Sequence, residues 1–348
     1  MGIMLASDGP DAGDCAFRGI AMRIKATLFA ASAVSVCAFT SVWSQALIPQ
    51  RTTPPPAPAA APAPATPAPA PAAAVPAPAP APTAVKANCA NPNALGVGRV
   101  VQIDTTGGPG FGFEHFKQLD FLRDKEVVLT FDDGPWPVNT PSVLKTLADE
   151  CTKAIFFPIG KHATYYPEIL KHVAAEGHTV GAHTWSHANL NNKKLTDDQR
   201  KDEIEKGFSA VKWALGAAPS PFFRFPALQH PPTMVTYLGE RNISMWSCDL
   251  DSFDFKSRTA QKIVDTVMSK LEKNGKGIIL MHDFQKHTAE ALPEIMKRLK
   301  AGGYKVVQVK AKAPLQTIAK YDEELVKDVK LPTVSSRPVN SVVQTISE

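Results

Sequence analysis

Seven short apolar runs, separated by longer amphipathic stretches, constrain the fold of this chain more than any other feature of its sequence. They cover Val127–Phe131, Ala154–Ile159, Thr179–His183, Phe222–Phe225, Ile243–Cys248, Gly277–Met281 and Lys305–Val309. The runs are continuous and rich in Val, Ile and Phe, which is typical of parallel strands buried on both faces. Between them, apolar residues recur at helical spacing, as at Ile204, Phe208 and Val211. The sequence therefore predicts a barrel-like α/β fold of seven β-α units, with an open doubly wound sheet as the alternative.

The first 86 residues differ in composition from the rest of the chain. Residues 1–46 are interpreted as an export segment that starts at Met22, because a basic flank precedes an apolar stretch over 26–43 and small residues end at Ala46. The alternative is an uncleaved membrane anchor, since 18 apolar residues can just span a bilayer. Residues 47–86 form a Pro/Ala-rich linker, in which 13 of the 29 residues of Pro54–Pro82 are proline. This bias predicts a semi-rigid spacer.

About 260 residues remain, enough for one large α/β domain. The interpretation divides them into a lead-in over 87–124, a catalytic domain over 125–312 and a tail over 313–348 that we expect to be partly disordered. The net charge of +5, without a block of Lys and Arg, gives only weak support to nucleic-acid binding, and no nucleic-acid motif is present. The absence of Gly-x-Ser-x-Gly and Gly-Lys-Ser/Thr motifs argues against a serine hydrolase and a P-loop enzyme.

Three cysteines lie beyond the export segment, namely Cys89, Cys151 and Cys248. In an oxidising compartment Cys89 and Cys151 are candidates for a disulfide that ties the lead-in to the domain, which leaves Cys248 buried. The sequence alone does not establish this connectivity. The spacings do not match a cysteine-based zinc site.

Polar motifs follow two of the predicted strands. The first strand ends in Asp132 and Asp133 before Gly134-Pro135, and the third runs into His183-Thr184-Trp185-Ser186-His187. Two imidazoles four residues apart in a helical turn face the same way and can hold one divalent ion. With one carboxylate added, the set leaves a coordination position open for water, as catalytic rather than structural metal sites do.

Three further strands end in residues suited to catalysis. Arg224 follows the fourth strand, a run of aspartates from Asp249 to Asp254 follows the fifth, and His282 ends the sixth. Each alone is typical of a surface charge or a solvated loop. The carboxyl ends of parallel strands meet at one rim, so their joint presence predicts an active site there.

In this order the motifs resemble those of the polysaccharide deacetylases of carbohydrate esterase family 4, which share the NodB homology domain. The resemblance spans about residues 125–309 and rests on Thr-Phe-Asp-Asp-Gly-Pro and His-Thr-x-x-His. It implies a distorted (β/α)7 barrel, one divalent metal ion, most often zinc, and hydrolysis of N-acetyl groups on a polysaccharide. With the export segment, it implies an N-acetylated polysaccharide substrate in the periplasm, cell envelope or extracellular space, and membrane contact only through an uncleaved anchor.

The resemblance also implies roles for individual residues. The metal ligands would be Asp133, His183 and His187. Asp132 would be the general base, held by Arg224. His282 would be the general acid, oriented by an aspartate of the fifth-strand motif, for which Asp251 is the best match.

Two departures from the family pattern concern the substrate groove. Ala227 stands where the family usually has Tyr, although its backbone N–H can still serve an oxyanion; Phe255 replaces the Trp of Asp-x-x-Asp-Trp. Trp136 and Phe255 are candidates for contact with a sugar ring. Two alternatives stay open, a non-catalytic glycan-binding domain on the same fold and an O-acetyl esterase acting on xylan-like polymers.

Overall fold

The computed structural model of the protein describes residues 89–329. The predicted export segment, the Pro/Ala-rich linker and residues 330–348 lie outside the described residues. Among the helices of this described part, none is long and apolar enough to cross a membrane.

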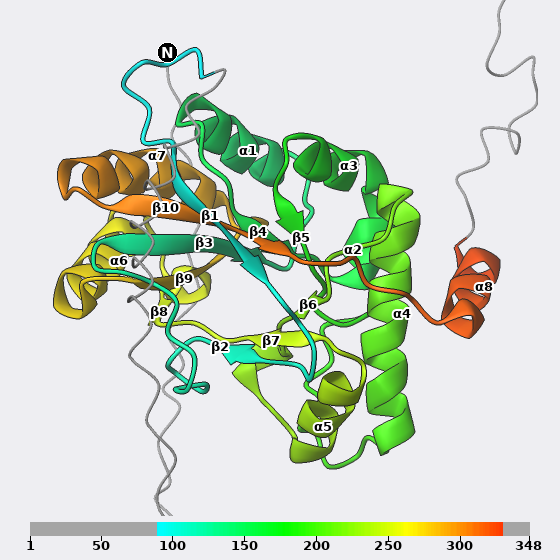
Figure 1. Cartoon of the computed structure of the whole chain (residues 1–348). Helices are drawn as coiled ribbons and strands as arrows, with labels where there is room; N and C mark the ends of the chain where they lie inside the picture. The colour runs from blue at the N-terminus through cyan, green and yellow to red at the C-terminus, as the bar shows by residue number, and fades with distance from the viewer. Residues whose placement is uncertain (1–88, 330–348) are drawn as a thin grey trace, which may run out of the picture. The chain divides into compact units, whose positions relative to one another are not determined.

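The strands of residues 89–329 pair in parallel and form two sheets (Figure 1). The seven-stranded sheet runs β1 (Val97–Ile103), β10 (Lys305–Ala311), β3 (Glu126–Asp132), β4 (Ile155–Phe157) and β5 (Thr179–Val180). In the same sheet β9 (Gly277–His282) pairs with β3, and β8 (Leu250–Asp251) pairs with β9. The three-stranded sheet runs β2 (Gly110–Phe111), β7 (Ser244–Trp246) and β6 (Phe222–Phe223).

The two sheets join into a distorted ring. An isolated bridge between Ala182 and Phe223 links the end of β5 to β6. The continuous run from β7 to β8 pairs with β6 at its start and with β9 at its end. All seven predicted strands are present, and the barrel prediction is confirmed over the open sheet.

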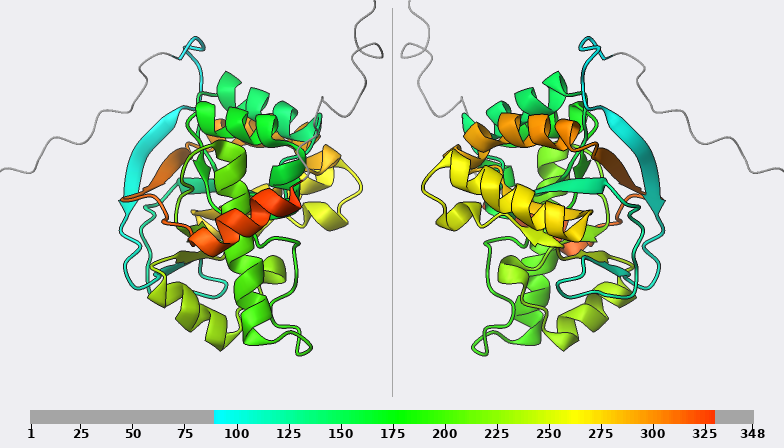
Figure 2. Two further views of the ribbon diagram at one scale, coloured as in Figure 1. Left: turned by 90° about the vertical axis from the view of Figure 1, so that its right-hand side faces the viewer. Right: turned by 90° about the vertical axis from the view of Figure 1, so that its left-hand side faces the viewer.

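Helices surround the strands on several sides (Figures 1 and 2). They are α1 (Asn139–Asp149), α2 (Gly160–Tyr165), α3 (Pro167–Ala175), α4 (Asp197–Leu215), α5 (Pro232–Glu240), α6 (Ala260–Asn274), α7 (Lys286–Ala301) and α8 (Ala319–Asp328), with 3₁₀ turns η1 (Pro226–Leu228) and η2 (Asp254–Lys256). The longest, α4, begins with the capping box that its sequence predicts, in which Thr196 and Gln199 exchange hydrogen bonds. It ends at Gly216, whose φ of 68° favours glycine.

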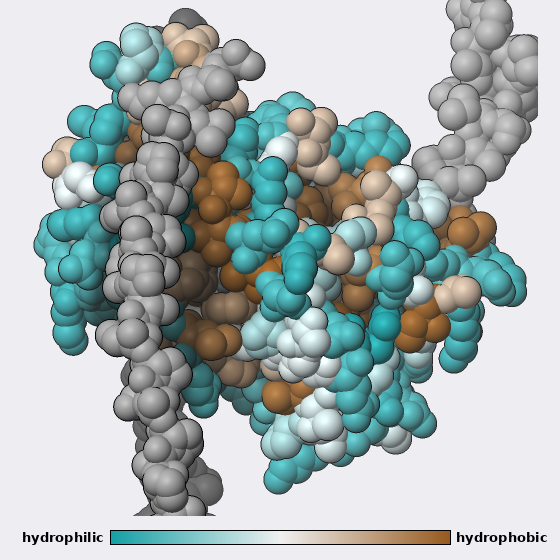
Figure 3. Space-filling view, viewed as in Figure 1, coloured by the Kyte–Doolittle hydropathy of each residue, from teal (hydrophilic) through white to brown (hydrophobic). Residues whose placement is uncertain are grey.

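The core explains why the strands are apolar without alternation. On β3, Val127, Leu129 and Phe131 pack in the layer between strands and helices. Val128 points the other way, into a second cluster with Phe157 and other residues inside the ring. Both faces of β3 are therefore buried, as in parallel α/β sheets. Figure 3 shows apolar residues gathered on the face that β1 crosses, and Val100 of β1 stays 45% exposed.

Two segments outside the predicted catalytic domain join its fold. The lead-in supplies β1, which pairs with β10, and β2, which pairs with β7. The disulfide between Cys89 and Cys151 is present, as predicted, and Cys248 is buried. Part of the tail is ordered as α8, where Tyr321 and Leu325 are buried and Lys212 of α4 pairs with Asp322 at 2.8 Å.

Candidate active site

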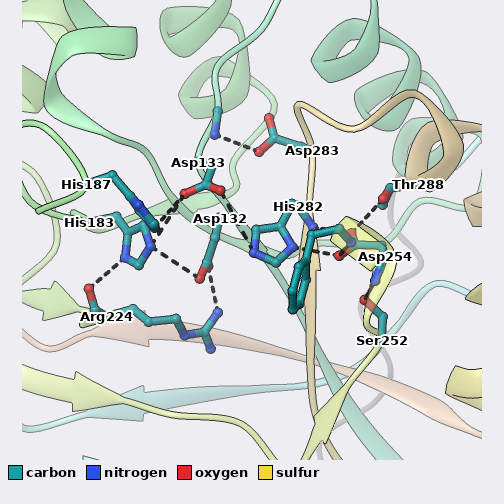
Figure 4. Close-up of polar contacts among 12 residues, drawn as sticks. Asp132, Asp133, His183, His187, Arg224, Ser252, Asp254, His282, Asp283 and Thr288 are labelled. Carbon is teal, nitrogen blue, oxygen red and sulfur yellow. Dashed lines mark hydrogen bonds and ion pairs between the residues drawn. The ribbon is translucent and has the colours of Figure 1, made fainter. Parts of the chain in front are cut away.

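A cavity of about 450 Å³ lies at the carboxyl ends of the strands. Its lining brings together most of the residues predicted from the motifs (Figure 4). The lining residues are Glu114, His115, Asp132, Asp133, His183, His187, Phe225, Ala227, Leu228, Gln229, Asp251, Phe255, Leu280 and His282.

Asp133, His183 and His187 converge on one point of this cavity. Their ligand atoms all lie within 4.8 Å of one another. The Nε2 atoms of His183 and His187 are each 3.5 Å from Oδ1 of Asp133. That oxygen is buried and has no hydrogen-bond partner among the described residues. A buried, orphaned carboxylate oxygen between two imidazole nitrogens fits a divalent cation.

The protonation state of His183 suits a metal ligand. Its Nδ1 lies 2.7 Å from the backbone oxygen of Arg224, so Nδ1 carries the hydrogen and Nε2 keeps its lone pair. Burial, followed by the neighbouring His187, lowers the pKa of His183 well below its ordinary value. The ring is therefore neutral, as metal ligation requires.

The two histidines do not lie on a helical turn, which corrects the basis of the prediction. Thr184 and His187 have φ values of 63° and 60°, in the left-handed region, so the chain bends sharply after β5. The bend packs against α4 at Gly207, where a Cβ would lie 2.7 Å from the backbone of Thr184. It is this bend and the close approach to α4 that bring the two rings together, with their centroids 4.9 Å apart.

Asp132 and Arg224 form a buried pair, as the resemblance implied. Nη1 of Arg224 donates to Oδ1 of Asp132 at 2.7 Å, and both side chains are almost fully buried. Arg224 also donates to the backbone oxygens of Trp246 and Ser247. Burial raises the pKa of Asp132 to about 6 although Arg224 acts in the opposite direction. A carboxyl group with such a pKa is suited to accept a proton near neutral pH.

His282 is paired with Asp254 and not with Asp251, which corrects the predicted assignment. Oδ1 of Asp254 lies 2.7 Å from Nδ1 of His282, and Oδ2 accepts the backbone N–H of His282 at 2.7 Å. The 3₁₀ turn η2 carries Asp254 into the protein, where Thr288 also donates to it. Asp251 instead accepts the N–H of Phe253 and lines the cavity.

The pKa of His282 moves in the opposite direction to that of His183. Burial alone would lower it, but the hydrogen bond and charge of Asp254, with the charges of Asp133 and Asp132, raise the pKa of His282 to about 10. Because Nδ1 is bonded to Asp254, Nε2 is the atom that faces Asp133, at 3.9 Å. The site thus combines a base candidate on β3 with an acid candidate on β9, at paired positions Asp132 and His282 of the sheet.

The three residues predicted to contact substrate have different positions. Ala227 and Phe255 line the cavity. The ring of Phe255 lies 5.7 Å from that of His282 and is 49% exposed. Trp136 is not among the lining residues, because its ring packs against His162 and Tyr166.

Sequence reasoning missed several residues of the site. Glu114 and His115 of the lead-in line the cavity, and no motif marks them. Their segment is tied to the strand end near Cys248, which donates from Sγ to Glu114 at 3.1 Å. His162, which also lies outside the motifs, has its Nδ1 2.6 Å from the backbone oxygen of Asp133. Only long-range contacts reveal these residues.

Comparison with known proteins identifies the family of this chain. The profile of the family described as polysaccharide deacetylase matches residues 121–246. A peptidoglycan-N-acetylglucosamine deacetylase of Bacillus cereus is 33% identical over 186 residues, which cover 52% of this chain and 66% of the relative. A chitooligosaccharide deacetylase of Sinorhizobium fredii is 32% identical over 175 residues, covering 48% of this chain and 80% of the relative.

A solved structure gives the same result. A peptidoglycan deacetylase of Bdellovibrio bacteriovorus superposes with a TM-score of 0.56 and 32% identity, over 62% of this chain and 59% of that one. The chain spans between 38% and 66% of the length of the first three curated relatives. By its motifs, its fold and these matches, the chain belongs to the polysaccharide deacetylase family, carbohydrate esterase family 4.

Proposed function

We propose that this protein is an exported, metal-dependent hydrolase that removes N-acetyl groups from a glycan of the cell envelope or its surroundings. One observation carries the proposal. The Asp133–His183–His187 set lines one cavity together with Asp132 and His282, which are held from behind by Arg224 and Asp254 respectively. The names of the relatives, which are deacetylases of peptidoglycan and chitooligosaccharide, favour an acetylated amino sugar as substrate.

Asp133, His183 and His187 would hold the metal ion. We propose zinc, because two imidazole nitrogens and one carboxylate are a donor set that zinc accepts while a position stays open. Such an ion supplies Lewis acidity toward water and toward the acetyl carbonyl. The residues around it then have to move two protons.

Asp132 is the base in this proposal. An amide carbonyl is a poor electrophile, so the attacking water must give up a proton as the bond forms. The carboxylate of Asp132 accepts it, and Arg224 fixes the orientation of that carboxylate through the 2.7 Å contact. The pKa near 6 lets Asp132 accept the proton and release it again at neutral pH.

His282 is the acid. The departing sugar amine needs a proton before acetate separates, and the Nε2–H of a charged imidazole can supply it. Asp254 holds the other nitrogen at 2.7 Å and keeps the ring protonated. The backbone N–H of Ala227 is proposed as a donor to the developing oxyanion, and Phe255 as an apolar wall of the sugar site.

The test is release of acetate by the whole protein from chitooligosaccharide, peptidoglycan and acetylated xylan, with and without a chelator. We expect release from an N-acetylated glycan that stops with the chelator and returns with zinc. If acetate is released from xylan alone, the protein is an O-acetyl esterase and the proposal is wrong. Binding to glycans without release from any, with zinc restored, would replace it by a glycan-binding domain.

A further inference from the structure

A buried carboxyl group beside the site has no part in the mechanism above. Asp283 follows His282 directly and is 1% exposed. Its Oδ1 accepts the backbone N–H of Gly134 at 3.2 Å, and its Oδ2 accepts the hydroxyl of Thr140 at 2.5 Å. Figure 4 shows Asp283 beside the loop that carries Asp133.

These contacts join the loop that carries Asp133 to the segment that carries His282. Gly134 follows the metal-ligand candidate Asp133, and Thr140 lies in the first turn of α1, which begins where the loop ends. The Thr140 oxygen also accepts the N–H of Trp136 at 2.8 Å, so its own hydrogen is free for Asp283. Nδ2 of Asn139 donates to the backbone oxygen of Phe284 at 2.6 Å. The loop from β3 to α1 is thus tied to the segment that follows β9.

The fit between loop and carboxylate is specific. A Cβ built on Gly134 would collide with the carboxylate of Asp283, so only glycine allows this approach. Within the described residues, no Lys, Arg or His forms an ion pair with Asp283. A buried carboxyl group that meets only neutral donors is weak support for stability, because burial penalises its charge. What distinguishes Asp283 is its place, since it follows His282 directly and contacts Gly134, the neighbour of Asp133.

We propose that Asp283 is a positioning residue for the metal site. It holds the loop through Gly134 and Thr140, so that Oδ1 of Asp133 stays 3.5 Å from both imidazoles. Because it follows His282 on the same chain, it also keeps the acid at a constant distance from that loop. The inference rests on the proposed function for the identity of the metal site.

Zinc affinity of the whole protein, measured by competition with a chromophoric chelator, tests the inference without any substrate. We expect Asp283→Ala to weaken zinc binding about tenfold or more, the scale seen when groups that orient metal ligands are removed. Asp283→Asn keeps one acceptor, for Gly134, and should fall between wild type and alanine. On the substrate, kcat should fall while KM changes little.

Thr140 gives a second, milder pair of variants. Thr140→Ser keeps the hydroxyl and should bind zinc like wild type, whereas Thr140→Val removes it and should weaken binding severalfold. If Asp283→Ala does not fold, the Thr140 pair decides the question by itself. Equal zinc affinity of the valine and serine variants would overturn the inference.

Asp249 offers a matched control. Its carboxylate accepts two backbone N–H groups, from Phe113 at 2.6 Å and Ile278 at 2.7 Å, away from the proposed ligands. Asp249→Ala should lower the melting temperature and leave zinc affinity unchanged. If Asp283→Ala folds and keeps the zinc affinity and kcat of the wild type, the inference is overturned while the proposed function stands. Wild-type protein that binds no divalent cation would overturn the proposed function and the inference with it.

Discussion

Replacement of Asp254 by Asn tests the corrected acid assignment. Asn has nearly the same shape and can still accept one hydrogen bond, so the backbone N–H of His282 or the hydroxyl of Thr288 keeps a partner. What is lost is the negative charge 2.7 Å from Nδ1 of His282. The substitution therefore removes the stabilisation of the charged imidazole while leaving the turn η2 in place.

The size of the effect follows from the pKa of His282. The difference between its ordinary value of 6.5 and about 10 corresponds to about 5 kcal/mol in favour of the protonated ring. Asp254 makes the closest contact, whereas Oδ2 of Asp133 lies 3.9 Å away and would face the metal ion. Without Asp254, burial dominates and the pKa of His282 should fall to its ordinary value or below it. We expect kcat to fall by about 100-fold or more at neutral pH, the range of general acid catalysis.

The assay is the pH dependence of kcat/KM for acetate release. A raised pKa keeps His282 protonated up to alkaline pH, so the alkaline limb of the profile should move to lower pH in Asp254→Asn. Asp251→Asn is the matched control, because Asp251 lines the cavity without touching His282, and its alkaline limb should stay in place. An unmoved limb in Asp254→Asn, or a shift only in Asp251→Asn, would refute the assignment.

Three further predictions concern the site and the fold. His183→Ala should lose the metal ion, which elemental analysis of the purified protein measures; a stoichiometric metal content would exclude His183 as a ligand. Asp132→Asn should keep the metal and lose about 100-fold or more in kcat, and loss of metal would place Asp132 in the ligand set instead. Cys89→Ser with Cys151→Ser should lower the free energy of unfolding by about 2–4 kcal/mol, because the bridge spans 62 residues. Denaturant unfolding under non-reducing conditions measures this free energy. A double variant as stable as the wild type would contradict the prediction.

The strands and the metal-ligand candidates could be predicted because local patterns mark them. A strand buried on both faces, such as β3, needs apolar residues at nearly every position, and that run is visible in the sequence. Polar residues directly after such runs meet at one rim whatever the register of the sheet. By contrast β1 lies at the edge of the sheet and buries only its end residues, Val97 and Ile103, so it has no continuous apolar run and was missed.

The choice among the aspartates of the fifth-strand motif could not be made locally. Asp249, Asp251 and Asp254 are equivalent in type and close in sequence. In the structure Asp249 accepts hydrogen bonds from the backbone N–H groups of Phe113 and Ile278, whereas Asp254 is hydrogen-bonded to Nδ1 of His282. Phe253 enters the left-handed region at φ 52°, and this turn rotates Asp254 inward.

The sequence by itself determined which residues can do chemistry and that they stand at strand ends, since residue type and strand burial are local properties. The tertiary structure alone decided which of them touch. The pairs that make contact are far apart in the sequence. Asp254 and His282 are separated by 28 residues, Glu114 and Cys248 by 134, and Gly134 and Asp283 by 149. Such contacts depend on how the ring of strands closes, which no short stretch of sequence encodes.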